Sequence, residues 1–179
     1  TKFYERAETK DCIAYLRVVN QNKDDLSFER IINVPKRSIG ETTVKQINEY
    51  AKKNSLSLEK SAISLIQKNK IKPKTKLGLN SILNLLEKWR NDLFNKKIGH
   101  IKLIQTILDE SGYSQMLKDK KDLENENRLE NIKELINAMK EYDNLESFLE
   151  HVALATSLDQ NWEDKKVNLM TMHASKGLE

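Results

Sequence analysis

The sequence contains few of the residues on which turns and sheets depend. Its 179 residues include only five glycines and two prolines, and 6% of them are aromatic. Sheet-rich folds need many turns, in which Gly and Pro are enriched, so this scarcity favours long helices joined by short polar links. The length is enough for a sizeable core in one or two domains. We therefore expect a mainly α fold.

Cysteine and long apolar runs are equally scarce. The single cysteine, Cys12, excludes an internal disulfide and indicates an intracellular, cytoplasmic location. No apolar run approaches the roughly 20 residues of a membrane span, so no membrane partner is expected. The sequence starts without Met or an apolar leader and ends at Gly-Leu-Glu, so we expect an excised piece of a longer protein.

Motifs for catalysis and metal binding are missing too. The sequence has no G-x-x-x-x-G-K-[ST] phosphate loop, no His and Cys cluster with metal-ligand spacing, and no nucleophile motif. His100, His151 and His173 are far apart, and the first two fall on expected helices, where a structural role is expected. We expect the chain to bind and position a partner, with no bound cofactor or metal of its own.

Charge, in contrast, is abundant and unevenly distributed. Residues 1–100 contain 21 Lys and Arg against 11 Asp and Glu, whereas residues 101–179 contain 10 against 16. The basic part can attract phosphate, and the acidic part would face water or another basic surface. A Lys-rich sequence that merely decorates its solvent faces would show the same excess. Charge alone therefore leaves nucleic-acid binding open.

Apolar residues recur at helical spacing along most of the chain. They predict helices over residues 8–19, 26–32, 41–54, 58–66, 79–94, 101–108, 129–139 and 145–154. The residues expected to face inward include Leu26, Phe28, Val44, Ile47, Ala51, Ile63, Leu79, Trp89, Phe94, Ile104, Leu135 and Leu154. Asp24 or Asp25 and Ser57 suit helix starts, and Pro35 should stop a helix. Residues 68–76, with alternating lysines, are expected to form a solvated loop; a second phosphate contact is the alternative.

One turn between expected helices is the best candidate for DNA contact. A helix ends at Pro35, and the next begins at about Glu41. Gly40 would let a phosphate approach the backbone, and amides at a helix start attract anions. The candidate contact residues are Lys36, Arg37, Ser38, Ile39, Gly40, Thr42 and Thr43. The segment is similar to the hairpin of helix-hairpin-helix elements, which grip backbone without reading bases. An ordinary helix corner would use the same residues.

In the last residues of the chain, apolar side chains no longer recur at helical spacing. After an acidic link over residues 159–164, residues 167–172 predict a short strand, with Thr171 and His173 just beyond its end. Loops at the carboxyl ends of strands bind ligands in open α/β sheets, although a fortuitous polar loop is the alternative. One strand needs a sheet that this chain does not supply. We expect a helical domain over residues 1–165 and a mostly absent second domain to which residues 166–179 belong.

Three segments, in order, resemble the UvrD/PcrA/Rep-type superfamily 1 DNA helicases. Residues 170–179 (MTMHASKGLE) resemble motif V, T-x-H-x-x-K-G-L-E. Residues 3–17 (FYERAETKDCIAYLR) resemble the entry to the 2B subdomain, and residues 28–40 (FERIINVPKRSIG) resemble its F-E-R-x-x-N-x-P-x-R-G-I-G stretch. The similarity is weak from about residue 56 to residue 162.

The resemblance implies a fold and an activity. In this family two RecA-like motor domains bind ATP between them, and 2B is a mobile helical insertion in the second. The enzymes use ATP and Mg²⁺ to move 3′ to 5′ along single-stranded DNA and to unwind duplex. The chain would thus be 2B followed by the start of motif V in the second RecA-like domain. It would contribute duplex contact and regulation at a single-strand/duplex junction, in repair or replication, without ATP hydrolysis of its own.

The resemblance also assigns residues. Ser38, Ile39, Gly40 and Thr43 match the turn that grips duplex backbone. Thr171 and His173 match positions that contact the single strand, and Gly177 and Glu179 match positions near the nucleotide, with Glu179 as ribose partner. Ser38 replaces the first Gly of Gly-Ile-Gly, which is costly if that position needs a positive φ.

Two other functions fit the sequence. In the first, acidic helices between Leu123 and Glu150 dock a DNA-repair protein, which would make the chain an interaction or autoregulatory module. In the second, the chain is a helical domain of a helicase–nuclease.

Overall fold

The computed structural model describes residues 2–159, which are helical apart from short connections. The elements are η1 (Lys2–Glu5), α1 (Ala7–Asn20), α2 (Asp25–Ile31), α3 (Glu41–Asn54), α4 (Leu58–Gln67), α5 (Pro73–Phe94), α6 (His100–Glu110), α7 (Tyr113–Asp119), α8 (Leu123–Met139) and a helix over residues 145–159. No strand occurs in this part of the chain, so the mainly α prediction is confirmed. The expected strand, and the boundary between residues 165 and 166, lie outside the described residues.

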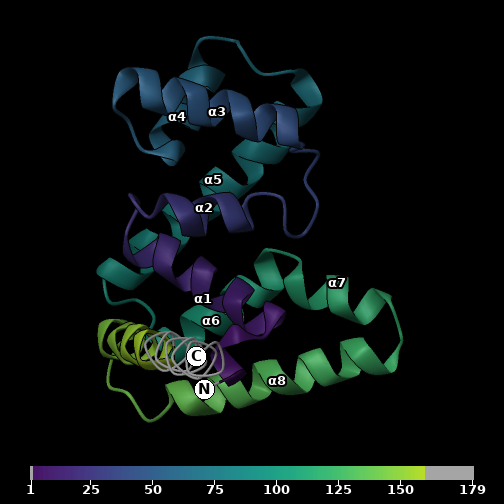
Figure 1. Cartoon of the computed structure of the whole chain (residues 1–179), viewed down its shortest axis with the longest axis vertical. Coiled ribbons are helices and arrows are strands. Elements are labelled where there is room, and N and C mark those ends of the chain that lie inside the picture. Colours follow the sequence, from purple (N-terminus) through teal and green to yellow (C-terminus); the bar gives the residue numbers. More distant parts are fainter. Residues whose placement is uncertain (1, 160–179) are drawn as a thin grey trace, which may run out of the picture.

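The helices are arranged along one long axis. Figure 1 shows α3 and α4 at one end, and α7, α8 and the helix over residues 145–159 at the other. The long helix α5 runs from the first end into the middle, where it packs on α1. None of the helices in residues 2–159 is long and apolar enough to cross a membrane.

Helix α1 lies at the centre of the core and packs against α2, α5, α6 and α8. Its residues Leu16 and Val19 are fully buried, as are Leu86 and Trp89 of α5. Burial of each such side chain contributes about 1.5–3 kcal/mol to stability, so this shared core stabilises the packing of α5 on α1. The indole of Trp89 donates to a Glu110 carboxylate oxygen at 3.0 Å, which satisfies its one polar atom.

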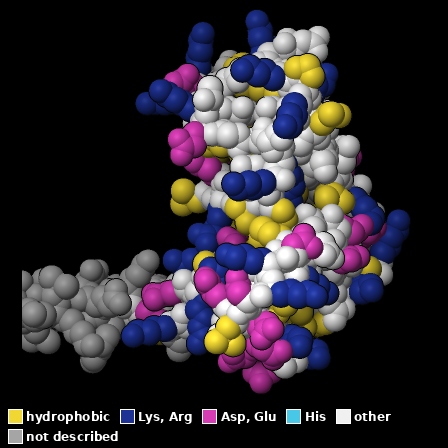
Figure 2. Space-filling view, turned by 90° about the vertical axis from the view of Figure 1, so that its right-hand side faces the viewer, with side chains coloured by type: hydrophobic (Ala, Val, Ile, Leu, Met, Phe, Trp, Pro, Cys, Tyr) yellow, Lys and Arg dark blue, Asp and Glu magenta, His cyan; other side chains and the backbone are white. Residues whose placement is uncertain are grey.

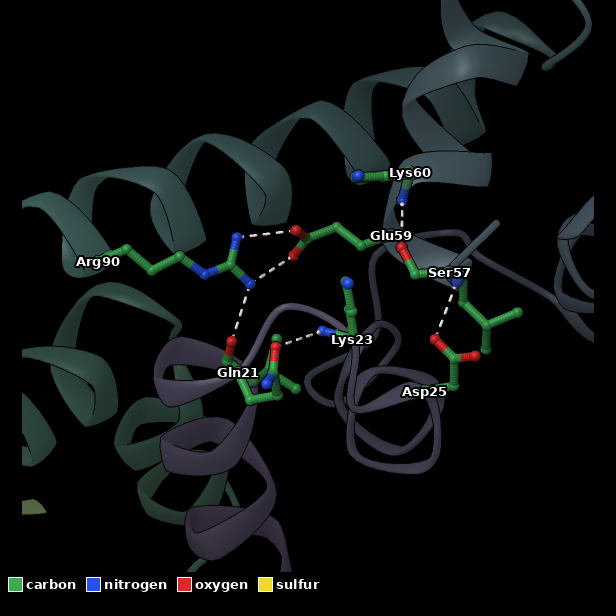
Figure 3. Close-up of polar contacts among 9 residues, drawn as sticks. Gln21, Lys23, Asp25, Ser57, Glu59, Lys60 and Arg90 are labelled. Atoms are coloured by element: carbon green, nitrogen blue, oxygen red, sulfur yellow. Dashed lines mark hydrogen bonds and ion pairs between the residues drawn. The ribbon is translucent and has the colours of Figure 1, made fainter. Parts of the chain in front are cut away.

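A buried ion pair joins the α3–α4 end to the rest of the molecule (Figure 3). Arg90 of α5 donates to both carboxylate oxygens of Glu59 in α4, at 2.7 and 2.8 Å, and to the Val18 carbonyl of α1 at 2.8 Å. The Arg90 and Glu59 side chains are 16% and 7% exposed. Beside them, Asp25 of α2 accepts a hydrogen bond from the Leu58 amide. These bonds connect α4 directly to α5 and α2, and through Arg90 to α1.

Several local predictions are confirmed. The Asp24 side chain caps α2 by accepting from the Ser27 amide, and Ser57 caps α4 by accepting from the Lys60 amide. Helix α3 covers the predicted residues 41–54. These features depend on neighbouring residues alone, and for that reason sequence rules find them.

Other predictions are wrong. The expected loop over residues 68–76 is too long, because α5 already begins at Pro73. Proline suits the first position of a helix, where a backbone N–H would have no acceptor within the helix. Four side chains expected inside are exposed: Leu26, Ile63, Phe94 and Leu154. Leu26 and Phe94 lie in the first or last turn of their helices, and Ile63 lies beside the buried face of α4. Helix α7, of seven residues, was not predicted.

Candidate nucleic-acid interface

The predicted turn, residues 33–40, connects α2 to α3 and is fixed by its own side chains. The Asn33 side-chain oxygen accepts from the amides of Arg37 at 2.7 Å and Ile39 at 3.2 Å. The Ile39 side chain is only 1% exposed and anchors the turn in the core. Ile39 can therefore offer a ligand its backbone but not its side chain.

Ser38 occupies the left-handed region, with φ +61°. Its carbonyl accepts from the Thr75 hydroxyl of α5 at 3.0 Å. For a residue other than Gly or Asn this conformation costs about 1–2 kcal/mol. The replacement of Gly by Ser at this position is thus costly, as expected, and the turn keeps its shape because other contacts hold it.

Arg37 supports the turn from inside. Its guanidinium donates to the carbonyls of Ile31 (2.8 Å), Ile32 (3.1 Å) and Ser111 (3.3 Å), and to the Tyr15 hydroxyl (2.7 Å). These bonds direct its guanidinium inward, and the expected attraction of Arg37 for phosphate stays a prediction. Burial raises the pKa of Tyr15 and outweighs the opposite effect of Arg37, so its hydroxyl stays protonated and donates to the carbonyl of Val34.

Gly78 allows α5 to approach the turn. A Cβ atom at Gly78 would lie 1.8 Å from the Arg37 carbonyl oxygen, a distance that no real Cβ atom adopts. We did not predict this role from the sequence, because Gly78 precedes the helix expected over residues 79–94. In the structure it lies inside α5, where a glycine costs about 1 kcal/mol relative to Ala and indicates a packing reason.

The start of α3 is open. Gly40 is its N-cap residue, with extended backbone and no side chain to cap the helix. The first amide bonded back to Gly40 is that of Val44, so within residues 2–159 the amides of Glu41, Thr42 and Thr43 have no acceptor. A Cβ atom at Gly40 would meet nothing within 4 Å. The fold does not require glycine there, but glycine leaves these amides uncovered.

Lysines lie near this opening, although Glu29 and Glu41 line the hollow beside Gly40 together with Lys45. Lys36 on the turn and Lys72 and Lys74 at the start of α5 are exposed. We call residues 33–78 the basic lobe, because they contain eleven Lys and Arg and only three Asp and Glu. On the face shown in Figure 2, Lys and Arg predominate over the upper part, and Asp and Glu are more numerous lower down. The turn thus lies within a positively charged surface.

The other expected site residues are not brought to this surface. Thr171, His173, Gly177 and Glu179 lie outside the described residues. Within residues 2–159, no group of three or more His, Cys, Asp and Glu side chains is placed to hold a metal ion. His100 contacts the Met139 carbonyl through its Nε2 atom at 2.9 Å, which gives it a structural role.

Comparison with known proteins extends the resemblance over the whole chain. Residues 1–179 match the UvrD-like helicase C-terminal domain family. The chain is 38% identical, over its full length, to the ATP-dependent DNA helicase PcrA of Bacillus subtilis, covering 26% of that protein. It is 36% identical over 99% of its length to DNA helicase II of Rickettsia typhi, covering 27% of that protein. The chain therefore spans about a quarter of the length of these relatives.

Proposed function

The chain belongs to the UvrD-like helicase family, and we propose that its turn before α3 binds the phosphate backbone of duplex DNA. One observation carries the proposal: three amides at the start of α3 have no acceptor among the described residues, and Gly40 leaves them uncovered. Such amides carry partial positive charge and attract anions. The rigid support beneath the turn keeps them in place before DNA arrives.

The contact does not read sequence. The groups offered are backbone amides, the Thr42 and Thr43 hydroxyls and the Lys36 ammonium, all of which bind phosphate oxygens. The buried Ile39 side chain and the inward guanidinium of Arg37 hold the turn but do not extend to the DNA. Duplexes of different sequence should therefore bind equally well.

The relatives are named as DNA helicases, one of them as ATP-dependent. We propose that the intact protein is an ATP-dependent helicase too. We propose 3′ to 5′ movement with ATP and Mg²⁺, at a junction of single-stranded and duplex DNA, in repair or replication. Thr171 and His173 would contact the single strand, and Gly177 and Glu179 the nucleotide. Motif V and the family membership support these assignments. The chain alone, without a phosphate loop, should not hydrolyse ATP, and a cytoplasmic location stays a prediction.

Duplex binding by two matched glycine variants tests the proposal. Gly40→Asp adds a negative charge beside the open amides, and Asp is a favoured N-cap residue that should not destabilise α3. Gly99→Asp makes the same change at the start of α6, where the N-cap backbone is also extended and a Cβ atom also meets nothing within 4 Å.

Fluorescence anisotropy with the 179-residue chain should show a loss of about tenfold or more in duplex affinity for Gly40→Asp, or about 1.4 kcal/mol. Gly99→Asp should bind like the unaltered chain. Equal affinities for the two variants would remove the turn from the interface.

A further inference from the structure

We propose that the start of α5 is a second phosphate-binding element, so that the duplex contact combines residues 72–76 with the turn before α3. This inference rests on the proposed function and extends it. It assigns to Lys72, Lys74 and Lys76 a role in binding nucleic acid, where the sequence pattern alone favoured a solvated loop.

The first observation is that the two elements form one continuous surface. The Thr75 hydroxyl donates to the Ser38 carbonyl at 3.0 Å, and Gly78 lies against the Arg37 backbone. Residues three apart on a helix share a face, so Thr75 and Gly78 meet the turn from one side of α5. Lys72 is the N-cap residue of α5 and lies three residues before the contact between Thr75 and the turn.

The second observation is that the backbone carrying these lysines is held in place. The Gln46 side-chain amide of α3 donates to the Lys70 carbonyl at 3.1 Å. Pro73 occupies the first turn of α5, and the Lys76 amide bonds back to the Lys72 carbonyl at 2.8 Å. The ammonium groups are thus attached to a fixed helix start, which reduces the entropy that a ligand must remove on binding.

The third observation is that the charges are available. Within residues 2–159, no carboxylate forms an ion pair with Lys36, Lys72, Lys74 or Lys76. Lys68 differs, because its ammonium donates to the Tyr50 hydroxyl at 2.8 Å and lies over the Tyr50 ring. Several unpaired cations on one rigid surface create a field that favours a densely charged anion.

A nucleic-acid backbone fits this surface better than an acidic protein does. Protein interfaces depend on apolar or aromatic anchors at their centre. The large apolar side chain exposed near the start of α5 is Leu77, at 74%. Two residues along a helix are about 200° apart, so Leu77 projects away from the face on which Thr75 meets the turn. The surface beside the turn therefore offers cations and backbone without an apolar anchor.

The test measures duplex affinity as a function of salt concentration for Lys72→Gln/Lys74→Gln. Each phosphate contact contributes about −0.9 to the slope of log affinity against log salt, so loss of two contacts should reduce the slope by about 1.8. Affinity at low salt should fall by about tenfold or more. Lys118→Gln/Lys121→Gln removes the same net charge from exposed positions near α7 and should change neither quantity.

The outcomes separate the two proposals. If Gly40→Asp weakens binding and Lys72→Gln/Lys74→Gln does not, the second element is overturned and the turn remains. If the lysine variant weakens binding and Gly40→Asp does not, the second element is supported and the turn is overturned. A chain that binds no duplex overturns both. If Leu77→Ala weakens binding as much as loss of the two lysines, the surface is an apolar docking site and the inference is overturned.

Discussion

The basic lobe and the acidic end of the molecule use charge in opposite ways. In the acidic end, residues 123–159, the helix α8 pairs its own cations within one turn: Arg128 with Glu124, and Lys133 with Glu130 at 2.9 Å. In the basic lobe, the one carboxylate in an ion pair is Glu59, and its partner is the buried Arg90 of the lower part of α5. Helix α8 thus pairs two of the three cations of the acidic end with its own carboxylates, whereas no exposed lysine of the basic lobe forms an ion pair within residues 2–159.

The helix starts differ in the same way. Asp122 caps α8 by accepting from the Asn125 amide at 2.8 Å, but Gly40 leaves α3 uncapped. An uncapped start is not enough to mark a site, since Gly99 leaves α6 uncapped as well. Near Gly99 the lysines share a groove with Asp143 and Glu146, and near Gly40 Lys45 shares a groove with Glu29 and Glu41. What distinguishes the start of α3 is its place in the basic lobe, where Lys and Arg outnumber Asp and Glu by eleven to three.

The largest expected effect concerns the ion pair that supports the basic lobe. Arg90→Met should destabilise the chain by about 3–5 kcal/mol, because it leaves the Glu59 carboxylate buried without its partner. Arg128→Met removes an exposed pair of the acidic end and should cost about 0.3–0.5 kcal/mol. Urea unfolding of both variants measures the difference. Similar losses of unfolding free energy in the two variants would contradict the expected difference between a buried and an exposed ion pair.

A smaller effect is expected at the contact between α5 and the turn. Gly78→Ala should cost about 1–3 kcal/mol, because the new methyl group overlaps the Arg37 carbonyl and forces the two segments apart. Duplex affinity should fall with it, since the turn and the start of α5 then separate. Gly40→Ala adds the same atom in open space and should cost less, with only the poorer N-cap preference of Ala lowering thermal stability. A stable Gly78→Ala chain with full duplex affinity would contradict the close approach.

A feature of the fold or the site could be predicted from the sequence when the residues in contact lie close together along the chain. The Asp24 and Ser57 caps, and the Gly40 turn, follow from neighbouring residues. The inward bonds of Arg37 were not predicted, because in the sequence it looks like a free cation beside Lys36. Its partners include the Ser111 carbonyl, 74 residues away, and no local pattern shows that contact.

The start of α5 was missed for a related reason. A proline ends one helix as readily as it begins another, so Pro73 among lysines is ambiguous from sequence. The contact between Thr75 and Ser38, 37 residues apart, settles the position of this segment, and it exists only in the folded chain. The prediction that Leu26 faces inward was wrong for another reason. Helix α2 is too short for the spacing of its apolar residues to define which face is buried.

The smallest expected effect concerns Ser38. Ser38→Gly relieves the left-handed conformation and should stabilise the chain by about 1 kcal/mol, with duplex affinity unchanged. A thermal unfolding curve and an anisotropy titration measure both. A fall in stability would mean that the serine side chain makes a contribution larger than the strain.

The amide signals of the chain in the presence of duplex DNA test the central claim most directly. In a ¹⁵N-labelled sample, addition of a short duplex should shift the amide signals of Glu41, Thr42 and Thr43 together with those of Lys72 and residues 74–76. The signals at the start of α6, His100 to Lys102, should stay in place, although that helix also begins uncapped. Shifts confined to α8, or equal shifts at the starts of α3 and α6, would contradict the assignment of the basic lobe as the duplex-binding surface.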